Sequence, residues 1–380
     1  MTTFDYIIIG AGAAGLMLAD GFGKESLFRN KSILVIDRDT KQTNDRTWCF
    51  WEKGKGDFDQ LVHKSWDQIF FAGTNFKSRQ PIRPYIYKMV RGIDFYREYL
   101  GRITLYPNIS ILKAEVLGIC SSQDGVELST NLGRYHCKMA FNSAPEYDRM
   151  VSQKKFPVLQ QHFLGWFVKT EKPTFDDRTT TFMDFSIPQK GNTRFMYVLP
   201  FSNTEALVEY TFFSKNPMTE QEYEAGLRDY MKKHLKSAGY SVSEIEKGSI
   251  PMTCYDFSSA NTENLFHIGA AGGWTKASTG FTFMNTYRKT QALIRLLKKE
   301  KPLDNLYIKD RFWFYDLLLL DILYCDNAKG QPIFESLFKK RSPQMIFKFL
   351  DGNTNLWEDL MIISACPKRE FIKALLKRIF

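Results

Sequence analysis

Cysteine pairs with metal-ligand spacing are missing from this 380-residue sequence. Its six cysteines are scattered along the chain and form no Cys-x-x-Cys pair. This distribution argues against a metal cluster and against a disulfide framework, and it is typical of proteins in a reducing compartment. The sequence therefore predicts no metal site and a cytoplasmic environment.

A long hydrophobic run is also missing. The longest apolar cluster, residues 317–320, is flanked by Asp316 and Asp321 and is too short to cross a bilayer. The sequence begins Met-Thr-Thr-Phe-Asp and continues directly into a predicted strand, which leaves no room for a signal peptide. We therefore expect a chain with neither a signal peptide nor a transmembrane helix, either soluble or bound at a membrane surface.

Aromatic residues and positive charge, in contrast, are abundant. Aromatic residues make up 15% of the sequence, which suits either a Phe-rich core or a long apolar ligand pocket. The net charge of +10 is compatible with binding to nucleic acid or an anionic membrane, or with solubility alone. No zinc-finger, RNP-type or basic-region motif is present, so no nucleic-acid partner is expected.

A dinucleotide-binding motif occupies the start of the chain. Residues 6–9 form a β-branched apolar run typical of a buried parallel strand, and Gly-Ala-Gly-Ala-Ala-Gly follows at 10–15 before a helical stretch. Its glycines permit a tight turn, close approach of a pyrophosphate, and packing of the helix on the strand. A second strand, 32–36, ends at Asp37, where a carboxylate can bind ribose hydroxyls. The predicted cofactor contacts here are Gly10, Gly12, Ala13, Gly15, Asp37 and Arg38.

A second glycine cluster lies far along the chain. The apolar run 264–268 leads into a glycine-rich segment and then into a helical stretch that ends at residue 301. A helix cap needs one glycine, so several glycines favour a return of the chain to the same cofactor, with N–H groups toward flavin or phosphate. The predicted contacts in this cluster are Gly269, Gly272, Gly273, Thr279 and Gly280.

The middle of the chain is typical of an antiparallel sheet inserted into the dinucleotide fold. Turn signals separate four strand-like runs, at 162–168, 179–185, 194–199 and 206–212, and an amphipathic helix is predicted over 216–239. Glu209 and Asp184 interrupt the aromatic, strand-forming sequence of two of these runs. A carboxyl in apolar surroundings has a raised pKa and can act as a general acid. A strand with one polar residue toward solvent gives the same pattern, so both interpretations stay open.

The last eighty residues alternate aromatic residues, leucine and lysine. The pattern predicts helices with one apolar and one basic face. Such helices can lie in the headgroup layer of an anionic membrane. Alternatively, their apolar faces close the core and their lysines are solvated.

Five segments carry a family resemblance. They are Asp-Tyr-Ile-Ile-Ile-Gly-Ala-Gly at 5–12, Asp-Arg-Thr-Trp-Cys-Phe-Trp at 45–51, Val-Arg-Gly-Ile-Asp-Phe at 90–95, Leu-Val-Glu-Tyr-Thr at 207–211, and Ala-Gly-Gly with Ser-Thr-Gly-Phe at 271–281. In this order the chain resembles the bacterial lycopene β-cyclases over nearly its whole length. The family is similar in fold to FAD-dependent hydroxylases and geranylgeranyl reductases.

The resemblance implies an α/β fold. An FAD-binding Rossmann-like domain of the glutathione-reductase or hydroxylase type would hold an inserted antiparallel β-sheet substrate domain, followed by a C-terminal helical region. We predict FAD-binding segments at 1–62, 101–156 and 251–301, substrate-domain segments at 63–100 and 157–250, and a helical membrane-surface region at 302–380.

The implied activity is an intramolecular lyase reaction, a redox-neutral isomerisation that needs reduced FAD, with NAD(P)H as reductant. A proton adds to the terminal alkene of an acyclic ψ-end, the neighbouring alkene closes a six-membered ring, and loss of a ring proton leaves a β-ionone end. Lycopene, or another acyclic carotenoid, would react through γ-carotene to β-carotene. The enzyme would be peripheral, at the cytoplasmic face of the membrane.

The resemblance also implies roles for particular residues. The family's acidic motif maps onto Glu209 with Tyr210 in the second acidic place, and Asp184 matches a Met-Asp segment. Redox relatives usually have Gly-Asp after the late strand, where this chain has Gly269-Ala270, which implies a more loosely held flavin. Arg46 joins the expected cofactor contacts. The expected substrate contacts are Trp48, Phe50, Trp51, Tyr210, Trp274 and Phe281.

Two other functions remain compatible with the sequence. One is an FAD-dependent redox enzyme on the same fold, either a prenyl reductase or a hydroxylase. The other is a flavoprotein that carries a carotenoid without turnover. The number of ends cyclised, the ring type, the proton donor (Glu209 or flavin) and the oligomeric state stay open.

Overall fold

The computed structural model describes residues 1–235 and 239–379, and the chain divides into two compact units. The first unit contains Met1–Asn44, Arg91–Phe156 and Cys254–Asp310; the second contains Asp45–Val90, Pro157–Thr253 and Arg311–Phe380. This division changes unit after residues 44 and 90, and the domain boundaries expected at residues 62 and 100 stay predictions. The C-terminal helices group with the inserted sheet.

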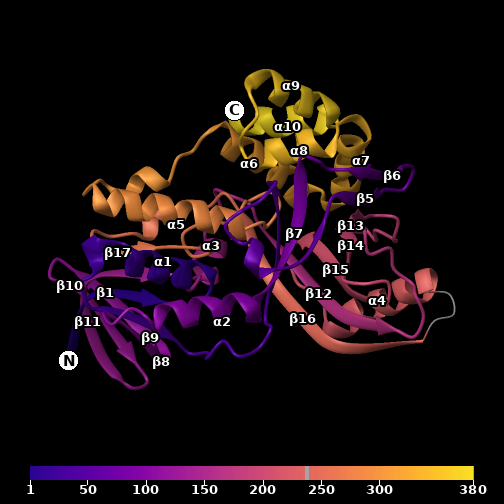
Figure 1. Ribbon diagram of the computed structural model, residues 1–380. Helices are drawn as coiled ribbons and strands as arrows, with labels where there is room; N and C mark the ends of the chain where they lie inside the picture. Colours follow the sequence, from indigo (N-terminus) through magenta and orange to yellow (C-terminus); the bar gives the residue numbers. More distant parts are fainter. Residues whose placement is uncertain (236–238, 380) are drawn as a thin grey trace. The chain divides into compact units, whose positions relative to one another are not determined.

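The first unit is built around a largely parallel sheet. Its strand order is β8-β2-β1-β11-β10-β9, with β17 paired to β11, and β1 runs parallel to both β2 and β11. Helix α1 packs against α2 and α5 (Figure 1). Its elements are β1 (Thr2–Ile9), α1 (Ala13–Lys24), β2 (Ile33–Asp37), α2 (Gly92–Ile103), β8 (Ile109–Lys113), β9 (Val116–Ser122), β10 (Gly125–Thr130), β11 (Gly133–Asn142), α3 (Tyr147–Ser152), β17 (Leu265–His267) and α5 (Phe283–Lys298). The predicted Rossmann-type order of strand, glycine turn, helix and strand is confirmed.

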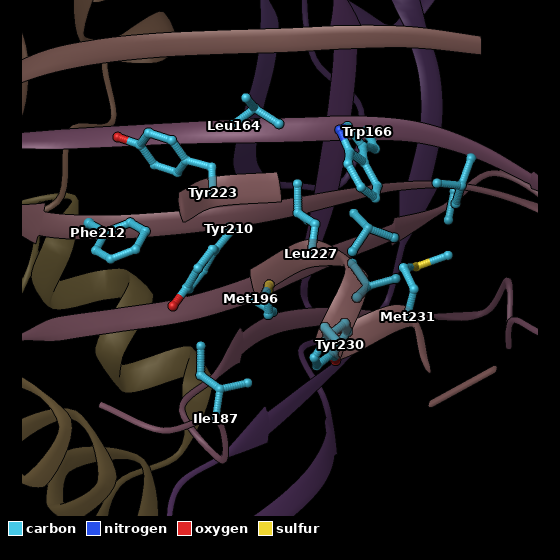
Figure 2. Close-up of a cluster of buried hydrophobic side chains, with 14 residues drawn as sticks. Leu164, Trp166, Ile187, Met196, Tyr210, Phe212, Tyr223, Leu227, Tyr230 and Met231 are labelled. Carbon is cyan, nitrogen blue, oxygen red and sulfur yellow. The ribbon is translucent and has the colours of Figure 1, made fainter. Parts of the chain in front are cut away.

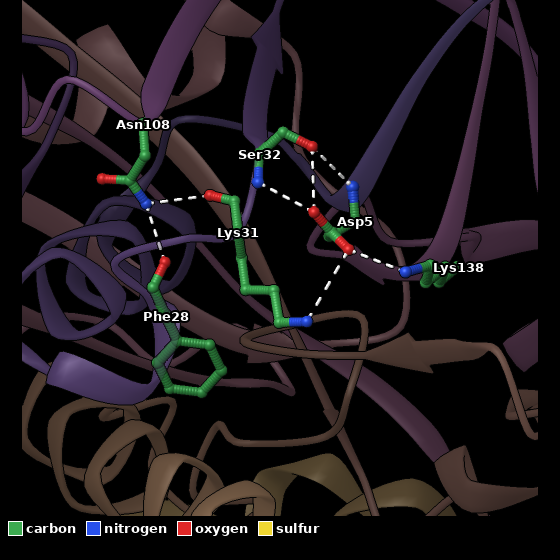
Figure 3. Close-up of polar contacts among 6 residues, drawn as sticks. All are labelled: Asp5, Phe28, Lys31, Ser32, Asn108 and Lys138. Atoms are coloured by element: carbon green, nitrogen blue, oxygen red, sulfur yellow. Dashed lines mark hydrogen bonds and ion pairs between the residues drawn. The ribbon is translucent and has the colours of Figure 1, made fainter.

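Polar contacts join the strands of this sheet at one end (Figure 3). The Asp5 carboxylate accepts hydrogen bonds from the Ser32 backbone N–H and the Lys138 ammonium, each at 2.9 Å. The Asn108 amide donates to the carbonyls of Phe28 and Lys31, also at 2.9 Å. These contacts link β1 with the starts of β2 and β8 and with β11.

The second unit contains a seven-stranded sheet and a three-stranded sheet. The larger sheet has the order β16-β12-β15-β14-β13-β5-β6, and the smaller has the order β3-β7-β4. The strands are β3 (Thr47–Lys53), β4 (Val62–Trp66), β5 (Gln68–Ala72), β6 (Lys77–Pro81), β7 (Tyr85–Arg91), β12 (Val158–Thr170), β13 (Thr179–Asp184), β14 (Thr193–Pro200), β15 (Glu205–Ser214) and β16 (Tyr240–Thr253). The four expected strand runs are confirmed, and β16 is a strand that the sequence patterns did not single out.

Helix α4 (Glu220–Leu235) covers one face of the larger sheet. Alternate residues of β15, among them Val208, Tyr210 and Phe212, pack against Tyr223 and Leu227 of the helix (Figure 2). Because successive side chains of a strand point to opposite faces, Glu209 points away from α4. The larger sheet therefore has one face closed by a helix and one face that carries Glu209.

The remaining helices of the second unit form a cluster at its C-terminal end (yellow in Figure 1). They are α6 (Arg311–Cys325), α7 (Gly330–Lys340), α8 (Pro343–Leu350), α9 (Leu356–Ala365) and α10 (Lys368–Ile379). The apolar stretch 317–320 lies in α6 and is largely buried. None of the helices in the described residues is long and apolar enough to span a bilayer.

Candidate active site

The glycine turn after β1 has the shape of a phosphate-binding loop. Gly10 has a φ of +94°, and a Cβ added at Gly15 would lie 1.9 Å from the Gly10 carbonyl oxygen, so neither position accepts a larger residue without strain. A Cβ at Gly12 would meet no atom within 4 Å. Gly12 is also the N-cap of α1 and provides no side-chain cap. The first turn of α1 is therefore open to an anion.

Polar groups around this turn have different surroundings. The Asp37 carboxylate at the end of β2 accepts a hydrogen bond from the Ala11 N–H at 2.6 Å. Arg38 extends into solvent, 4.0 Å from Glu115. Ala13 begins α1.

The second glycine cluster returns to the first one. A Cβ added at Gly269 would lie 2.7 Å from the Ala14 Cβ in the first turn of α1. The cluster follows β17, which pairs in parallel with β11, so it starts at the same edge of the sheet as the β1 turn. This arrangement brings together the two segments that the sequence predicts to share one cofactor.

Several buried polar atoms of this cluster have no partner. Among the residues that the structure describes, Trp274 Nε1, Ser278 Oγ and Thr279 Oγ1 are buried without a hydrogen bond. Buried polar groups are normally satisfied, so these atoms point to a missing polar ligand. With the open Gly12 and the uncapped α1, the residues present fit a dinucleotide cofactor. Gly272, Gly273 and Gly280 belong to the same segment, and Phe281 is half-buried.

In the second unit, Glu209 is one of a row of residues that crosses four strands. It is directly opposite Tyr197 of β14 and Gly165 of β12, and Gly165 is directly opposite Glu246 of β16. Residues opposite one another in antiparallel strands share a face of the sheet. Two carboxyls therefore lie on one face with a glycine between them, about 10 Å apart along the row.

Gly165 keeps the space between these carboxyls free of a side chain. A Cβ at this position would lie 3.5 Å from Cβ and Cγ of Glu209 and 2.9 Å from Leu207 Cδ1. Glu209, Tyr197 and Cys49 all lie deep in the protein, yet each keeps some accessible surface. Open space therefore adjoins these three side chains.

The surroundings of Glu209 favour its neutral form. Burial raises the pKa of Glu209 to about 8, a hydrogen bond from the Thr211 hydroxyl opposes this shift, and the charge of Glu246 adds to it. Burial also raises the pKa of Glu246, although its oxygens accept hydrogen bonds from the Thr47 N–H at 2.8 Å and the Thr47 hydroxyl at 2.5 Å. Glu209 is therefore protonated at neutral pH and can act as an acid.

Weakly acidic groups surround the Glu209 carboxyl. Burial raises the pKa of the Cys49 thiol, which hydrogen-bonds with the Tyr87 hydroxyl. Burial and the charge of Glu209 raise the pKa of the Tyr197 phenol. These groups stay neutral at physiological pH, so they do not compete with Glu209 as acids.

Asp184 and Tyr210 lie on the other face of the sheet from Glu209. The Asp184 carboxylate is buried, and it accepts hydrogen bonds from the Tyr230 hydroxyl of α4 at 3.0 Å and the Ser186 N–H at 2.8 Å. Tyr210 packs against α4, and its hydroxyl accepts a hydrogen bond from Arg194. The structure thus does not bring either residue to Glu209, and an acid at position 210 would not face Glu209 either.

The aromatic residues expected around the substrate have mixed environments. Trp51 donates from Nε1 to Asp351 at 3.0 Å and stacks on Phe347 at 4.6 Å. Phe50 is buried, and its ring and that of Phe58 form a T-shaped pair. Trp48 is half-buried, and Arg46 is exposed, with Nη1 donating to the Asp45 carbonyl. Their roles as ligand contacts stay predictions.

Sequence reasoning missed three residues of this site: Glu246, Tyr197 and Cys49. Glu246 lies in a strand with the polar pattern Ser-Val-Ser-Glu-Ile-Glu-Lys, where nothing distinguishes a buried acid from a solvated one. Tyr197 and Cys49 lie within runs that were identified, but no pattern showed which residues of other strands each would lie near. Strand register was the missing information.

Comparison with known proteins agrees with this architecture. The sequence matches the family described as lycopene cyclase protein over residues 5–376. A geranylgeranyl bacteriochlorophyll reductase-like protein from Thermoplasma acidophilum is similar over 99% of both chains, with 13% identity and a TM-score of 0.69. A flavoprotein/dehydrogenase from Cytophaga hutchinsonii is similar over 99% of this chain and 100% of its own, with 13% identity and a TM-score of 0.61.

The halogenase PltM, solved in complex with phloroglucinol and FAD, is similar over 98% of this chain and 86% of its own, with 15% identity and a TM-score of 0.59. At such identities these structures show a common fold alone. The family match, in contrast, spans nearly the entire sequence. On this basis the chain belongs to the lycopene cyclase family.

Proposed function

We propose that this protein is a lycopene β-cyclase that converts the ψ-ends of lycopene to β-ionone rings without net oxidation or reduction. The observation that carries the proposal is the Glu209 carboxyl, whose pKa near 8 keeps it protonated at neutral pH. It lies deep in the protein, beside open space, and it shares a face of the sheet with a second carboxyl, Glu246. An acid-initiated cyclisation needs a proton donor of this kind.

In the proposed reaction, Glu209 donates its proton to the terminal alkene of the substrate, and a tertiary carbocation forms. The carboxylate that remains is next to the cation and stabilises it electrostatically. The neighbouring alkene closes the ring, and a ring proton then returns to Glu209, so the enzyme ends unchanged. Tyr197 contributes an aromatic face near the cation. Atoms and electrons balance, and the product is an isomer of the substrate.

We assign the cofactor site to the two glycine segments of the first unit. The N–H groups that follow Gly12 would hold the pyrophosphate of FAD, and Asp37 would bind the ribose. Ser278 and Thr279 supply hydroxyls that have no partner among the described residues. Bound FAD, reduced with NAD(P)H as the donor, would supply an electron-rich surface that stabilises positive charge. The predicted domain boundaries and the remaining cofactor and substrate contacts are part of this proposal.

We further assign a peripheral membrane contact, at the cytoplasmic face, to α9 and α10. Leu356, Trp357 and Leu360 of α9 are 68%, 71% and 57% exposed. Helix α10 adds exposed apolar side chains among basic ones, including Lys373 and Lys377. Exposed apolar groups with a basic surround fit an anionic lipid surface, from which a C40 hydrocarbon could be taken up.

A redox enzyme is the second candidate, because the similar structures include a geranylgeranyl reductase-like protein. Anaerobic incubation of lycopene with the protein, FAD and dithionite separates the two functions. We expect a cyclic product of unchanged mass. A product that has gained hydrogen would contradict the cyclase assignment.

The same assay tests Glu209. We expect Glu209→Gln to lose activity by about a hundredfold or more, because the variant has no proton to give. Glu205→Gln is the matched control, since Glu205 is on the same strand in an exposed ion pair with Lys169. Full activity of Glu209→Gln would contradict the assignment of Glu209 as the acid.

A further inference from the structure

A cavity of about 270 Å³ lies between the larger sheet of the second unit and helix α4. Ile187, Met196 and Phe212 form part of its apolar wall (Figure 2), and Arg194 and Tyr210 line it from β14 and β15. Glu209 points to the opposite face of the sheet. This cavity is therefore separate from the proposed acid site, and it is too small for a C40 substrate.

Arg194 is held in one position at the wall of this cavity. It is 5% exposed. Its Nη1 donates to the Tyr210 hydroxyl at 3.0 Å, its Nε donates to Asn192 Oδ1, and its Cζ lies 4.8 Å from the centre of the Phe212 ring. These contacts leave the second terminal nitrogen, Nη2, without an acceptor among the described residues. The guanidinium is thus fixed and still has donors to offer.

No carboxylate neutralises this cation in the part of the chain that the structure describes, since no Asp or Glu lies within ion-pair distance of Arg194. The contrast with Lys88 is direct: this lysine is 4% exposed and pairs with Glu52 at 2.8 Å and Asp59 at 2.5 Å. Burying an unpaired charge costs free energy, whereas a bound anion would offset that cost.

Other charged groups also line the cavity. Lys190 and Lys233 add positive charge, and Glu222 and Asp229 add negative charge. Glu222 is already engaged, because it accepts hydrogen bonds from the N–H and hydroxyl of Thr219 at 2.8 Å. Three cations face two carboxylates, so the cavity keeps an excess of positive charge.

The nearby His162 is affected by the charge of Arg194. Its ring nitrogens contact the Tyr223 hydroxyl at 2.5 Å and the Ser214 hydroxyl at 2.6 Å. Burial and, to a lesser extent, the charge of Arg194 lower the pKa of His162 to about 4. His162 is therefore neutral at physiological pH and adds no charge to the site.

We propose that this cavity binds a small amphipathic anion, with its carboxylate or phosphate group on Arg194 and the Tyr210 hydroxyl and its apolar body along Ile187, Met196 and Phe212. The charge requirement comes from the buried guanidinium, and the apolar requirement comes from the wall. The limited volume excludes long chains.

Calorimetric titration of the full-length protein tests this site with four probes: octanoate, butyl phosphate, inorganic phosphate and octanol. We expect octanoate or butyl phosphate to bind at least about tenfold more tightly than octanol, because only the anions accept charge-assisted hydrogen bonds. The preferred anion identifies the head group. Stronger binding of inorganic phosphate than of both amphipathic anions would contradict the apolar part of the proposal.

Variants connect the binding to this cavity. Arg194→Met should reduce the affinity for the anion to that for octanol, and Ala225→Leu, which fills the cavity from α4, should abolish binding of every probe. Arg228→Gln is the control, since Arg228 is on α4 but pairs with Glu224 outside the cavity. If Arg194→Met fails to fold, anion binding by Ala225→Leu still tests the proposal. Unchanged anion binding in either folded variant, equal binding of octanol and octanoate, or no binding at millimolar concentrations of the probes would overturn the proposal.

Discussion

At the scale of single residues, burial raises the pKa of Glu209, and the residues across the sheet from it do not oppose this shift. Gly165 contributes no side chain, Tyr197 contributes a phenol that stays neutral, and Glu246 contributes a second carboxyl two strands away. Glu246 disfavours a negative charge on Glu209, and Gly165 and Tyr197 bring no positive charge that would balance it. Among the residues that the structure describes, only the Thr211 hydroxyl stabilises the carboxylate directly.

The raised pKa of Glu209 predicts a pH-dependent stability. Below its ordinary pKa of 4.5 the carboxyl is protonated in both the folded and the unfolded chain. Between this value and about 8, only the unfolded chain loses the proton, so the free energy of unfolding falls as the pH rises, and above about 8 the loss is complete. Replacing Glu209 by Gln should therefore stabilise the protein by about 2.5–3 kcal/mol more at about pH 9 than at about pH 6.

Urea denaturation of both proteins at the two pH values measures this difference. Activity of the natural protein should decline as the pH rises through the folded pKa of about 8, since the acid form disappears there. A stability difference that does not change with pH would show that Glu209 ionises normally. Glu205→Gln again serves as the control, because its exposed ion pair should contribute little at either pH.

The residues differ in how well sequence could predict them. Glu209 could be singled out because it interrupts an apolar strand. Glu246 could not, since its partner Thr47 is 199 positions away and its own strand has a polar pattern. Asp184 could be chosen because it interrupts aromatic, strand-forming sequence, and Tyr210 from the family resemblance. Which face of the sheet they occupy depends on register, which local sequence does not determine.

At the scale of elements, the β1 turn and α1 follow from short-range rules. Strand, glycines and helix occur as predicted because Gly15 must be small for the helix to approach the Gly10 carbonyl. On α4, Gly226 has a comparable reason: a Cβ there would lie 2.1 Å from Tyr210 Cε1. This second glycine has no sequence signal, because the ring that requires it comes from β15.

The two glycines of the turn should respond differently to alanine. Gly12→Ala should leave the stability of the flavin-free protein nearly unchanged, because Gly12 has ordinary extended φ and ψ and no atom within 4 Å of the new methyl. It should weaken FAD binding by about tenfold or more, because the methyl occupies the approach of the pyrophosphate. Gly15→Ala should instead destabilise the fold by about 2 kcal/mol or more, since its Cβ meets a carbonyl oxygen.

Flavin fluorescence titration and urea denaturation without flavin measure the two effects. Normal FAD affinity in Gly12→Ala would argue against a pyrophosphate at this turn. A stable Gly15→Ala protein would mean that α1 can shift, contrary to the close packing described here.

At the scale of the whole molecule, sequence order predicted the architecture. The alternation of segments between two units is visible in the glycine motifs and strand runs. The three-stranded sheet is less visible, because β3, β4 and β7 pair only through long-range contacts, and this sheet moves the start of the second unit to Asp45. The grouping of α6–α10 with that unit likewise depends on tertiary packing.

The exposed apolar side chains of α9 predict membrane binding that can be removed without unfolding. Replacing Leu356, Trp357 and Leu360 together by serine should reduce co-sedimentation with vesicles that contain anionic lipid by about tenfold or more, since these side chains are largely exposed. Activity on lycopene dispersed in detergent should stay normal. Leu132→Ser, at a site in the first unit that is 60% exposed, is the control and should change neither property. Equal sedimentation of all three proteins would exclude α9 as the contact.

Glu209 and Tyr210 are consecutive residues of β15, and their side chains point to opposite faces of the larger sheet. A carboxylate placed at 210 would meet the Arg194 guanidinium, not the acid, and the internal ion pair so formed would occupy the donors that an outside ligand could use. Glu209 would keep its proton in such a variant. A substitution on one face of β15 can thus change the anion site there and leave the acid on the other face intact.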